Sequence, residues 1–402
     1  MNTKWIVSID DYRRAARRKL PKMIYDYLEG GALDESTVRA NRESLDALLL
    51  KQRNFVDLTG LDTTTTLLGT EVTMPLLVSP MGMLTIFDSG SDVAVANAAA
   101  AAGSIFVHSA WAGCSIEEVV GSTPATVWAQ VGLWKDTREV ADYLDRVEAL
   151  GVDTIVIAGD VSSSSKRERD LHHGMSMPPR PPVVDYLRTA TKPGWIWKWR
   201  TGRAMTYGNY SVDSRPMNMS EMNKWMADNK NKAVTWSDIQ DIRRRWSGKV
   251  VIKGIMNGED AKRAVHEGVD AVFVSNHGGR QFDAQPATID VLPEVVEAVD
   301  GGAQVFLDGG IRRGHDIVKA MALGADAVMA GRPFASALAA RGQAGVEHAF
   351  AVYREELIGA MGFVGARRVA EIDRSVLWNV AGRPTTPCHD VPLPLDRIRQ
   401  ER

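Results

Sequence analysis

Short apolar runs alternate with helical stretches from Pro75 to the region of Pro333. Eight of the apolar runs suit strands, at residues 76–78, 105–109, 126–133, 154–157, 249–253, 271–275, 304–307 and 327–330. Segments rich in Ala with helical spacing separate them, for example 92–102, 137–150, 259–267, 286–299 and 315–323. Strands that alternate with helices pair in parallel, and eight such units over roughly 260 residues predict an α/β fold, a (β/α)8 barrel.

The segments outside this pattern are expected to belong to the same single domain, 1–402. Residues 1–73 form an expected N-terminal helical layer, in which 10–28 has helical spacing and Pro21 divides it into two helices. The expected barrel, 74–362, contains an insertion at about 171–235. Residues 363–402 form an expected C-terminal arm, and its proline-rich end from Gly382 suits an extended segment that wraps a neighbouring subunit.

Composition excludes several classes of protein. The chain has 48 basic and 50 acidic residues, so it lacks the field that attracts nucleic acid. Its two cysteines, Cys114 and Cys388, have no metal-ligand spacing and suit ordinary thiols in a reducing compartment, so no metal site is expected. We find no signal peptide and no run of roughly 18 to 20 apolar residues, and we therefore expect a soluble, cytoplasmic protein.

The insertion carries four prolines between 178 and 182 and the cluster Trp-Ile-Trp-Lys-Trp-Arg at 195–200. A segment this long between a strand and a helix is usually a lid or a surface for a partner. We expect a lid or a packing surface between subunits. Trp beside Lys and Arg also suits a weak membrane-surface contact through 193–200, which remains an alternative.

Polar side chains follow every expected strand, where a barrel of this kind places its catalytic groups. In chain order they are Ser79, Ser109 with Trp111, Gln130, Asp160, Lys253, Ser275 with His277 and Arg280, Asp308, and Gly331 with Arg332. A histidine exchanges protons near neutral pH, and an arginine three residues later can hold a carboxylate through two hydrogen bonds. The sequence therefore predicts a base beside an anion site.

Glycines follow the last two expected strands, in Asp308-Gly-Gly-Ile-Arg-Arg-Gly314 and Ala330-Gly-Arg-Pro333. Backbone N–H groups and arginines in these two loops form the usual phosphate site of the fold. We therefore expect a phosphorylated cofactor.

Six motifs make the chain resemble the FMN-dependent α-hydroxy-acid oxidase and dehydrogenase family, which includes flavin-type lactate and mandelate dehydrogenases. They lie at 20–31, 167–170, 252–254, 275–281, 307–314 and 331–333, and the histidine motif Ser-Asn-His-Gly-Gly-Arg-Gln at 275–281 is the most specific. The resemblance covers nearly the whole chain. It implies the barrel, FMN as cofactor, a small 2-hydroxy acid as substrate and a homotetramer or octamer.

The resemblance also implies roles for single residues. His277 would be the base that acts on the substrate, Asp160 would stabilise its protonated form, and Lys253 would stabilise the reduced flavin. The substrate would contact Arg167, Arg280, Tyr27, Trp111 and the position of Gly132. The residues implied to bind FMN are Ser79, Met81, Gly82, Ser109, Gln130, Lys253, Ser275, Asp308, Gly309, Gly310, Arg312, Gly331 and Arg332.

Two positions depart from the family pattern. The third strand usually reads Gln-Leu-Tyr, with a tyrosine that helps to bind the substrate, whereas this chain has Gly132 there. The fourth strand has Ala158 in place of a hydroxyl that contacts the flavin, followed by serines at 162–165. We expect Gly132 to open space for a bulky or aromatic (S)-2-hydroxy acid; compensation by Tyr207, Tyr210 or a lid residue is the alternative.

Two other functions are compatible with the sequence. The same histidine and arginines would also serve oxidation, oxidative decarboxylation or deamination of a specialised metabolite or modified amino acid. A barrel that binds FMN structurally, within an assembly held by the insertion and the tail, is the third interpretation.

Overall fold

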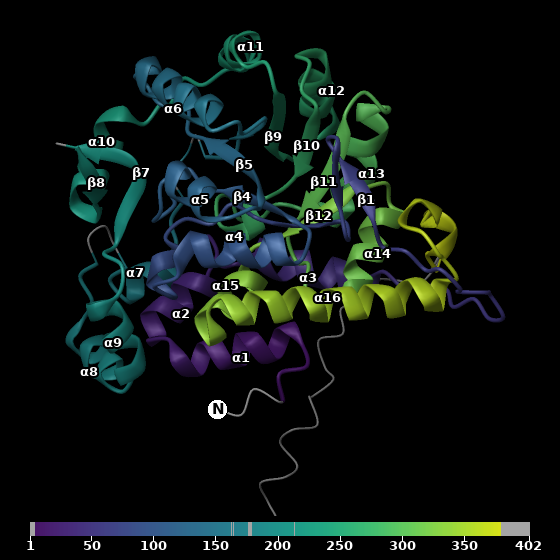
Figure 1. Ribbon diagram of the computed structural model, residues 1–402, viewed down its shortest axis with the longest axis horizontal. Coiled ribbons are helices and arrows are strands. Elements are labelled where there is room, and N and C mark those ends of the chain that lie inside the picture. The colour runs from purple at the N-terminus through teal and green to yellow at the C-terminus, as the bar shows by residue number, and fades with distance from the viewer. Residues whose placement is uncertain (1–4, 162, 164, 176–178, 213, 379–402) are drawn as a thin grey trace, which may run out of the picture.

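The structure is a computed structural model that describes residues 5–378 apart from 162, 164, 176–178 and 213. Within this part of the chain, eight parallel strands close into a barrel in the order β3, β4, β5, β6, β9, β10, β11, β12, with β12 paired to β3 (Figure 1). Their bounds are Leu76–Val78, Ile105–His108, Thr126–Val131, Thr154–Ala158, Lys249–Ile255, Ala271–Val274, Gln304–Asp308 and Ala327–Ala330. The predicted (β/α)8 fold is confirmed, and β3 and β12 have the predicted bounds.

The barrel interior is a packed core separate from the layer between strands and helices. On β10, Phe273 belongs to the inner cluster, whereas Val272 and Val274 join the outer one. This alternation follows from the two-residue period of a strand. A hairpin of β1 (Thr65–Leu67) and β2 (Thr70–Val72) adds Leu67 and Val72 to the inner cluster and bonds to Gln304 at the start of β11. It therefore closes the N-terminal end of the barrel.

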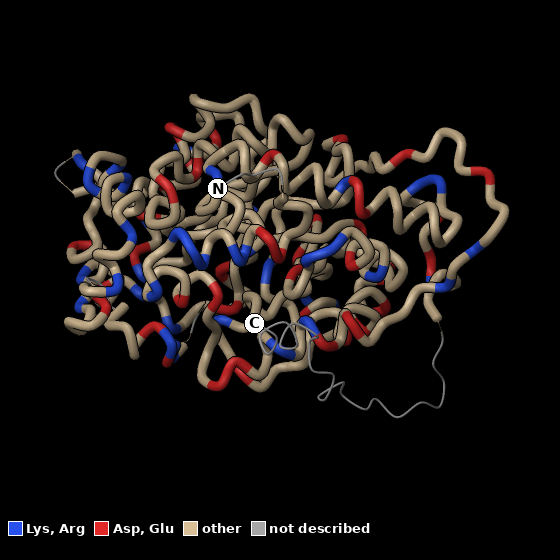
Figure 2. Tube along the Cα trace, turned by 90° about the horizontal axis from the view of Figure 1, so that it is seen from below, with Lys and Arg blue, Asp and Glu red and all other residues tan. Residues whose placement is uncertain are grey.

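Helices surround the strands. They are α4 (Ser91–Ala101), α5 (Ile116–Ser122), α6 (Thr137–Ala149), α11 (Trp236–Arg245), α12 (Gly258–His266), α13 (Thr288–Val299), α14 (Gly314–Ala322), α15 (Arg332–Arg341) and α16 (Gln343–Val364). The ends of the helices expected from spacing differ from these by at most two residues. Lys and Arg are interspersed with Asp and Glu along the trace (Figure 2).

The N-terminal layer contains α1 (Ile9–Lys19), α2 (Lys22–Glu29) and α3 (Ser36–Ala47). Pro21 separates α1 from α2 as predicted, because α1 already ends at Lys19 and the proline precedes the next helix. The helix α3 was not predicted. Only Thr37, Asn41 and Leu45 of α3 are buried, so its apolar pattern is weak and its main contacts are polar ones to the barrel.

The insertion is folded into helices and a two-stranded sheet. Its described elements are α7 (Glu168–His172), α8 (Val183–Ala190), α9 (Pro193–Thr201), the antiparallel strands β7 (Thr206–Val212) and β8 (Arg215–Asn218), and α10 (Met219–Asn229). Asn218 and Glu221 form a capping box that starts α10 directly after β8. These elements form the left edge of Figure 1.

After α16 the chain makes short turns at Val369–Glu371 and Arg374–Val376, and Leu377 pairs with Leu50. The proline-rich end of the expected arm, from Gly382, lies outside the described residues. In the part of the chain that the structure describes, every helix is too short or too polar to cross a membrane.

Candidate active site

The histidine loop has an unusual backbone. His277, Gly278 and Gly279 have φ values of 56°, 60° and 73°, all in the left-handed region. The loop is held because the N–H of His277 donates to Ser275 Oγ at 3.1 Å, and the N–H of Gly279 donates to Asn276 Oδ1 at 3.2 Å. A non-glycine residue in this conformation costs about 1 to 3 kcal/mol, and such residues gather at functional sites.

His277 lies in a network of charges drawn from the ends of four strands, β6, β9, β10 and β11. Its Nδ1 is 3.0 Å from Asp160 Oδ2, which follows β6. Lys253 Nζ on β9 donates to Ser275 Oγ at 2.6 Å and is 3.2 Å from Asp308 Oδ2 and 3.9 Å from Asp160 Oδ2. Burial opposes ionisation of Asp160, but the charges of His277 and Lys253 lower its pKa to about 2. Asp160 is therefore a carboxylate placed to orient the imidazole of His277.

Two arginines form a cationic centre beside this network. Arg280 Nη1 donates to the carbonyls of Tyr27 at 2.9 Å and Gly30 at 2.7 Å, and its guanidinium lies 5.1 Å from the centre of the Tyr27 ring. Arg167 Nε donates to the Arg280 carbonyl at 3.2 Å. Burial and the charge of Arg167 lower the pKa of Arg280 to about 9. A bound carboxylate would relieve this repulsion.

The expected space beside Gly132 is filled. A Cβ built on Gly132 would lie 2.9 Å from the indole ring of Trp134, so the absence of a side chain admits Trp134. Trp134 Nε1 donates to Tyr210 Oη at 3.1 Å, and its ring centre is 5.3 Å from that of Trp111. The expectation that Gly132 opens volume above the cofactor was therefore wrong. Trp111 and Trp134 form an aromatic wall at the barrel mouth.

The residues expected to touch the flavin ring gather at one end of the barrel. Gln130 Oε1 accepts from Ser109 Oγ at 3.3 Å and from the N–H of Ala110 at 3.2 Å. The N–H of Ser79 donates to the Ala330 carbonyl at 2.9 Å, which joins the first and last strand ends. Among the described residues, Asp308 Oδ1 is buried without a hydrogen-bond partner. A polyhydroxylated chain would satisfy that oxygen, so this end of the barrel fits FMN.

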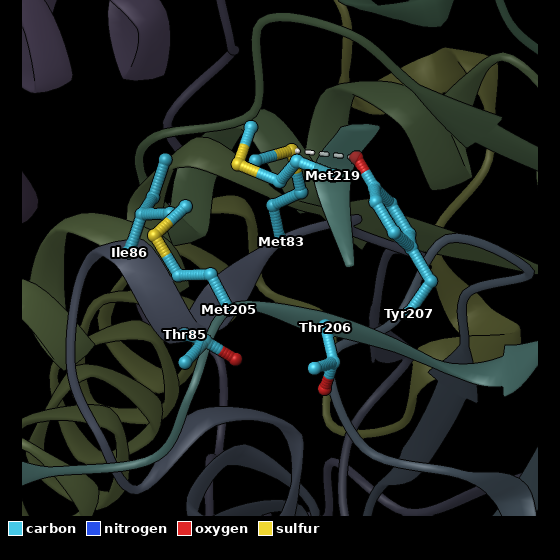
Figure 3. Close-up of a pocket in the computed structure, with 7 residues that line it drawn as sticks. All are labelled: Met83, Thr85, Ile86, Met205, Thr206, Tyr207 and Met219. Atoms are coloured by element: carbon cyan, nitrogen blue, oxygen red, sulfur yellow. Dashed lines mark hydrogen bonds between the residues drawn. The ribbon is translucent and has the colours of Figure 1, made fainter. Parts of the chain in front are cut away.

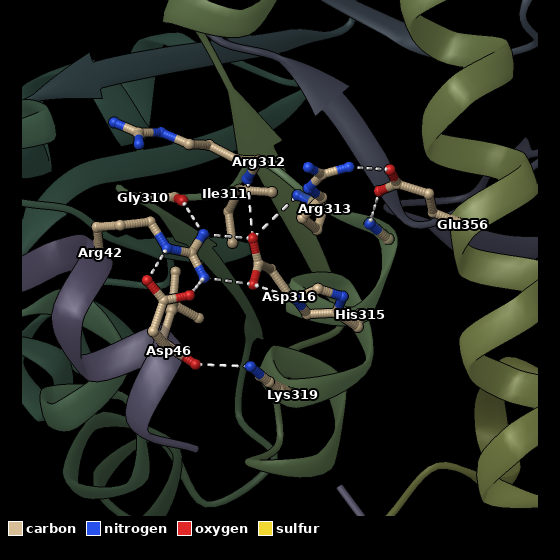
Figure 4. Close-up of polar contacts among 12 residues, drawn as sticks. Arg42, Asp46, Gly310, Ile311, Arg312, Arg313, His315, Asp316, Lys319 and Glu356 are labelled. Atoms are coloured by element: carbon tan, nitrogen blue, oxygen red, sulfur yellow. Dashed lines mark hydrogen bonds and ion pairs between the residues drawn. The ribbon is translucent and has the colours of Figure 1, made fainter. Parts of the chain in front are cut away.

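The two arginines expected to bind the phosphate, Arg312 and Arg332, differ in how far their side chains are already engaged. The side chain of Arg312 points away from the ion pairs around Asp316 in Figure 4, whereas the backbone N–H of Arg312 donates to Asp316 Oδ2 at 2.9 Å. Burial and the nearby Arg13 lower the pKa of the Arg312 guanidinium. Arg332 already donates to the carbonyls of Leu28, Gly278 and Gly30. Arg312 is the better placed of the two for a phosphate.

The glycines of the last two loops serve close packing. A Cβ on Gly310 would lie 2.4 Å from the Asn41 carbonyl, and one on Gly309 would lie 3.1 Å from Asn41 Nδ2. The absence of a side chain at Gly309 and Gly310 therefore lets α3 pack closely against this loop. A Cβ on Gly331 would lie 3.3 Å from Ser79 Cβ and 3.5 Å from Met81 Sδ, and one on Gly82 would lie 2.8 Å from Trp111 Cβ. These contacts bring the loops after β3, β4 and β12 together around the mouth.

Sequence reasoning missed Met83, Trp134 and Asn41 as site residues. Met83 has a φ of 59° and lies in the loop after β3. Asn41 exchanges hydrogen bonds of 2.9 Å with Asn276 in the histidine loop. The sequence does offer a signal for two of them. Met83 directly follows Met81 and Gly82, which were expected to bind FMN, and Trp134 is a large aromatic residue two positions after Gly132. Nothing in the sequence near α3 marks Asn41.

The sequence profile of FMN-dependent dehydrogenases matches residues 16–379. The chain is 38% identical over 369 residues to L-lactate dehydrogenase of Vibrio cholerae, covering 91% of this chain and 97% of that protein. It resembles the crystal structure of a monotopic membrane protein, (S)-mandelate dehydrogenase, with a TM-score of 0.89 and 32% identity over 94% of this chain and 100% of that one. It also resembles mandelate oxidase with (S)-4-hydroxymandelic acid, with a TM-score of 0.80 and 34% identity over 92% and 98% of the two chains.

A closed barrel with a histidine, paired carboxylates and arginines at its mouth, together with these matches, defines a flavin oxidoreductase. The chain belongs to the FMN-dependent dehydrogenase family. It is an FMN-dependent enzyme that oxidises 2-hydroxy acids.

Proposed function

We propose that the enzyme oxidises an (S)-2-hydroxy acid with a bulky, aromatic side chain to the 2-oxo acid. The observation that carries the proposal is the convergence of His277, Asp160, Arg280 and the aromatic wall at one end of the barrel. A wall of two perpendicular indole rings favours an aromatic substrate through offset or edge contacts. The relatives named as mandelate oxidase and (S)-mandelate dehydrogenase support the same substrate class.

We assign each charged residue of the site a role that suits its charge. Arg280 and Arg167 would hold the substrate carboxylate, since among the described residues Nε and Nη2 of Arg280 have no hydrogen-bond partner. His277 would take a proton from the substrate, and Asp160 would stabilise the resulting imidazolium. FMN, when bound, accepts the two electrons that leave the substrate carbon. Lys253 would place a buried positive charge beside the cofactor. Asp308, Ser109, Gln130 and Ser275 would also contact the cofactor.

Anaerobic mixing tests this proposal. The visible flavin absorbance should bleach with (S)-mandelate, and the rate constant should exceed that for L-lactate about tenfold or more, which is the discrimination that burial of a large apolar group supplies. (R)-mandelate is the control and should leave the absorbance unchanged. Bleaching by none of these acids would contradict the reaction, and faster bleaching by L-lactate would contradict the aromatic side chain.

The alternative chemistry on a specialised metabolite rests on Gly132 and on the altered fourth strand. Trp134 occupies the space beside Gly132, so that position no longer favours the alternative, and the fourth strand is its remaining ground. If the protein were a barrel that binds FMN only structurally, His277→Ala would leave the turnover rate unaffected. We expect instead that the turnover rate falls about 10²-fold or more, as it does when a general base is removed.

We also propose that the surface formed by α8 and α9 contacts a membrane. Val183, Tyr186, Leu187, Trp197 and Trp199 are exposed there, Val183 at 75% and Trp197 at 69%. Arg188 and Arg200 lie on the same two helices and are exposed as well. Aromatic and apolar side chains beside basic ones suit the interface of an anionic bilayer. The similarity to a monotopic membrane protein supports this proposal, in which the enzyme works at the cytoplasmic face.

Vesicle flotation tests the membrane contact. The wild type should float with vesicles of anionic phospholipid, and Trp197→Ser with Trp199→Ser should stay in the dense fraction. Phe363→Ser is a matched control, because Phe363 on α16 is 66% exposed but lies outside this surface. Equal flotation of wild type and double variant would contradict the proposal. Dissociation of a tetramer or octamer in the double variant would show that subunits pack there instead.

A further inference from the structure

Residues of the insertion reach the barrel mouth through β7. The N–H of Gly208 donates to the Ala112 carbonyl at 3.0 Å, and a Cβ at Gly208 would lie 2.2 Å from the backbone of Cys114. Asn209 Nδ2 donates to the Ser109 carbonyl at 3.2 Å, and Asn209 Oδ1 accepts from the N–H of Ile116 at 3.0 Å. Glycine therefore admits close contact, and the amide fixes the register of β7 against the loop after β4.

This register places the neighbouring residue, Tyr207, inside the mouth. Tyr207 is 1% exposed, and its ring packs edge-on against Trp111 at a centroid distance of 6.3 Å. Its hydroxyl donates to Met83 Sδ at 3.4 Å, as Figure 3 shows. The hydroxyl of Tyr27 points at the same sulfur from α2, at 3.8 Å. Two phenols from distant segments thus converge on one methionine.

The convergence point adjoins the cationic centre. Tyr27 lies under the Arg280 guanidinium, and its carbonyl binds Arg280 Nη1. Burial and the nearby Tyr27 raise the pKa of Tyr207, so its phenol remains a hydrogen-bond donor at neutral pH. A thioether is a weak acceptor, and an anionic oxygen is a much stronger one. A substrate carboxylate held by Arg280 would compete well with Met83 for these donors.

We propose that Tyr207 is a substrate-binding residue, whose phenol donates to the carboxylate of the 2-hydroxy acid and replaces the tyrosine that Gly132 lacks. This inference rests on the proposed function, because it takes a carboxylate as the ligand of Arg280. It makes the insertion part of the active site: β7 completes the substrate pocket. A neutral donor at this point adds binding energy without adding a third positive charge to Arg167 and Arg280.

The test measures binding, so that it does not depend on turnover. Pyruvate and phenylglyoxylate, two unreactive 2-oxo acids, are titrated into the FMN-loaded enzyme, and the dissociation constant is read from the perturbation of the flavin absorbance. Tyr207→Phe removes one oxygen and keeps the ring against Trp111. We expect a dissociation constant about tenfold higher, equal to about 1.4 kcal/mol, with unchanged thermal midpoint and FMN content.

Tyr143→Phe is the matched control. Tyr143 lies on α6 and is buried, and its hydroxyl has no partner among the described residues, so its loss should leave the dissociation constant unchanged. A dissociation constant for Tyr207→Phe within twofold of the wild type overturns the proposal, as does absence of binding of both acids to the wild type. Binding that depends on Tyr207 without bleaching by any 2-hydroxy acid would retain the carboxylate site and reject the proposed oxidation.

Discussion

At the scale of single residues, Gly132 shows how a missing side chain is compensated. Trp134 is held in place by its hydrogen bond to Tyr210 and by Trp225, whose ring centre is 4.6 Å away. A tyrosine restored at Gly132 would therefore meet an indole that cannot move freely. Trp134 thus fills the space directly after β5 where the family has a tyrosine side chain.

Gly132→Ala tests this packing. The added methyl group would lie 2.9 Å from the Trp134 ring, and overpacking of this kind costs about 1 to 3 kcal/mol. Urea denaturation should show that loss in the free energy of unfolding. Gly121→Ala is the control: Gly121 lies in α5 with open space around its Cα, so alanine should stabilise the helix by up to about 1 kcal/mol. Equal stability of the Gly132 variant and the wild type would contradict close packing.

Asp160→Asn tests the histidine pair. The variant keeps the size of the side chain but removes the charge that lies 3.0 Å from His277 Nδ1. We expect the rate constant of anaerobic flavin reduction to fall about 10²-fold, because the protonated imidazole loses its stabilising partner. Stopped-flow absorbance measures this rate, and the visible spectrum of the oxidised enzyme reports whether FMN is still bound. A fall of less than threefold would rule out this role for the carboxylate.

At the scale of elements, α3 is held by the histidine loop. Asp283 accepts hydrogen bonds from the N–H groups of Thr37 at 2.8 Å and Ser36 at 3.2 Å, and from Ser36 Oγ at 2.8 Å. It thereby caps a helix whose preceding residue, Glu35, makes no side-chain cap. Burial raises the pKa of Asp283, but these hydrogen bonds outweigh it and lower the pKa from 3.8 to about 2.

The cap should make stability depend on pH. The lowered pKa means that the contribution of Asp283 is fully present above 3.8 and is lost as the pH falls toward about 2. Asp283→Asn should cost about 1 kcal/mol at pH 7, and the difference from the wild type should narrow below pH 4. Urea denaturation at pH 7, 5, 4 and 3 measures this difference. Asp142→Asn, at an exposed position on α6, should change little, and a constant difference for Asp283→Asn would contradict the cap.

The elements also show what the sequence could predict. The barrel strands are buried on both faces because helices and core cover them, so each appears in the sequence as a short, mostly apolar run. The insertion has no such signal. Of α8 and α9 together, only Asp185 is buried, and they dock through polar contacts such as Trp195 Nε1 to the Ile86 carbonyl at 2.9 Å. Contacts of this kind depend on residues distant in sequence and leave no periodic pattern.

At the scale of the whole molecule, the mouth is assembled from the N-terminal layer, the loops after the barrel strands and β7 of the insertion. The end of each strand could be predicted, and with it His277, Asp160 and Lys253. Residues that approach from outside the barrel, such as Asn41 of α3, could not, because their position depends on how separate layers pack.

Removal of FMN should therefore loosen contacts between layers. A ligand at about 100 times its dissociation constant adds about 2.7 kcal/mol to the stability of the folded state. The thermal midpoint of the apoprotein should rise by several degrees when FMN is added, as measured by scanning calorimetry. Riboflavin lacks the phosphate expected near Arg312 and should give a smaller rise; an equal rise with both ligands would contradict a phosphate contact there.

The β1–β2 hairpin has a kinetic consequence. With one end of the barrel closed by this hairpin and its interior filled, the hydroxy acid and the molecule that later reoxidises the flavin must both arrive at the opposite end of the barrel. Each would have to wait for the other to leave. Double-reciprocal plots of the initial velocity against the concentration of either reactant should then give parallel lines, the pattern of an enzyme to which two reactants bind alternately.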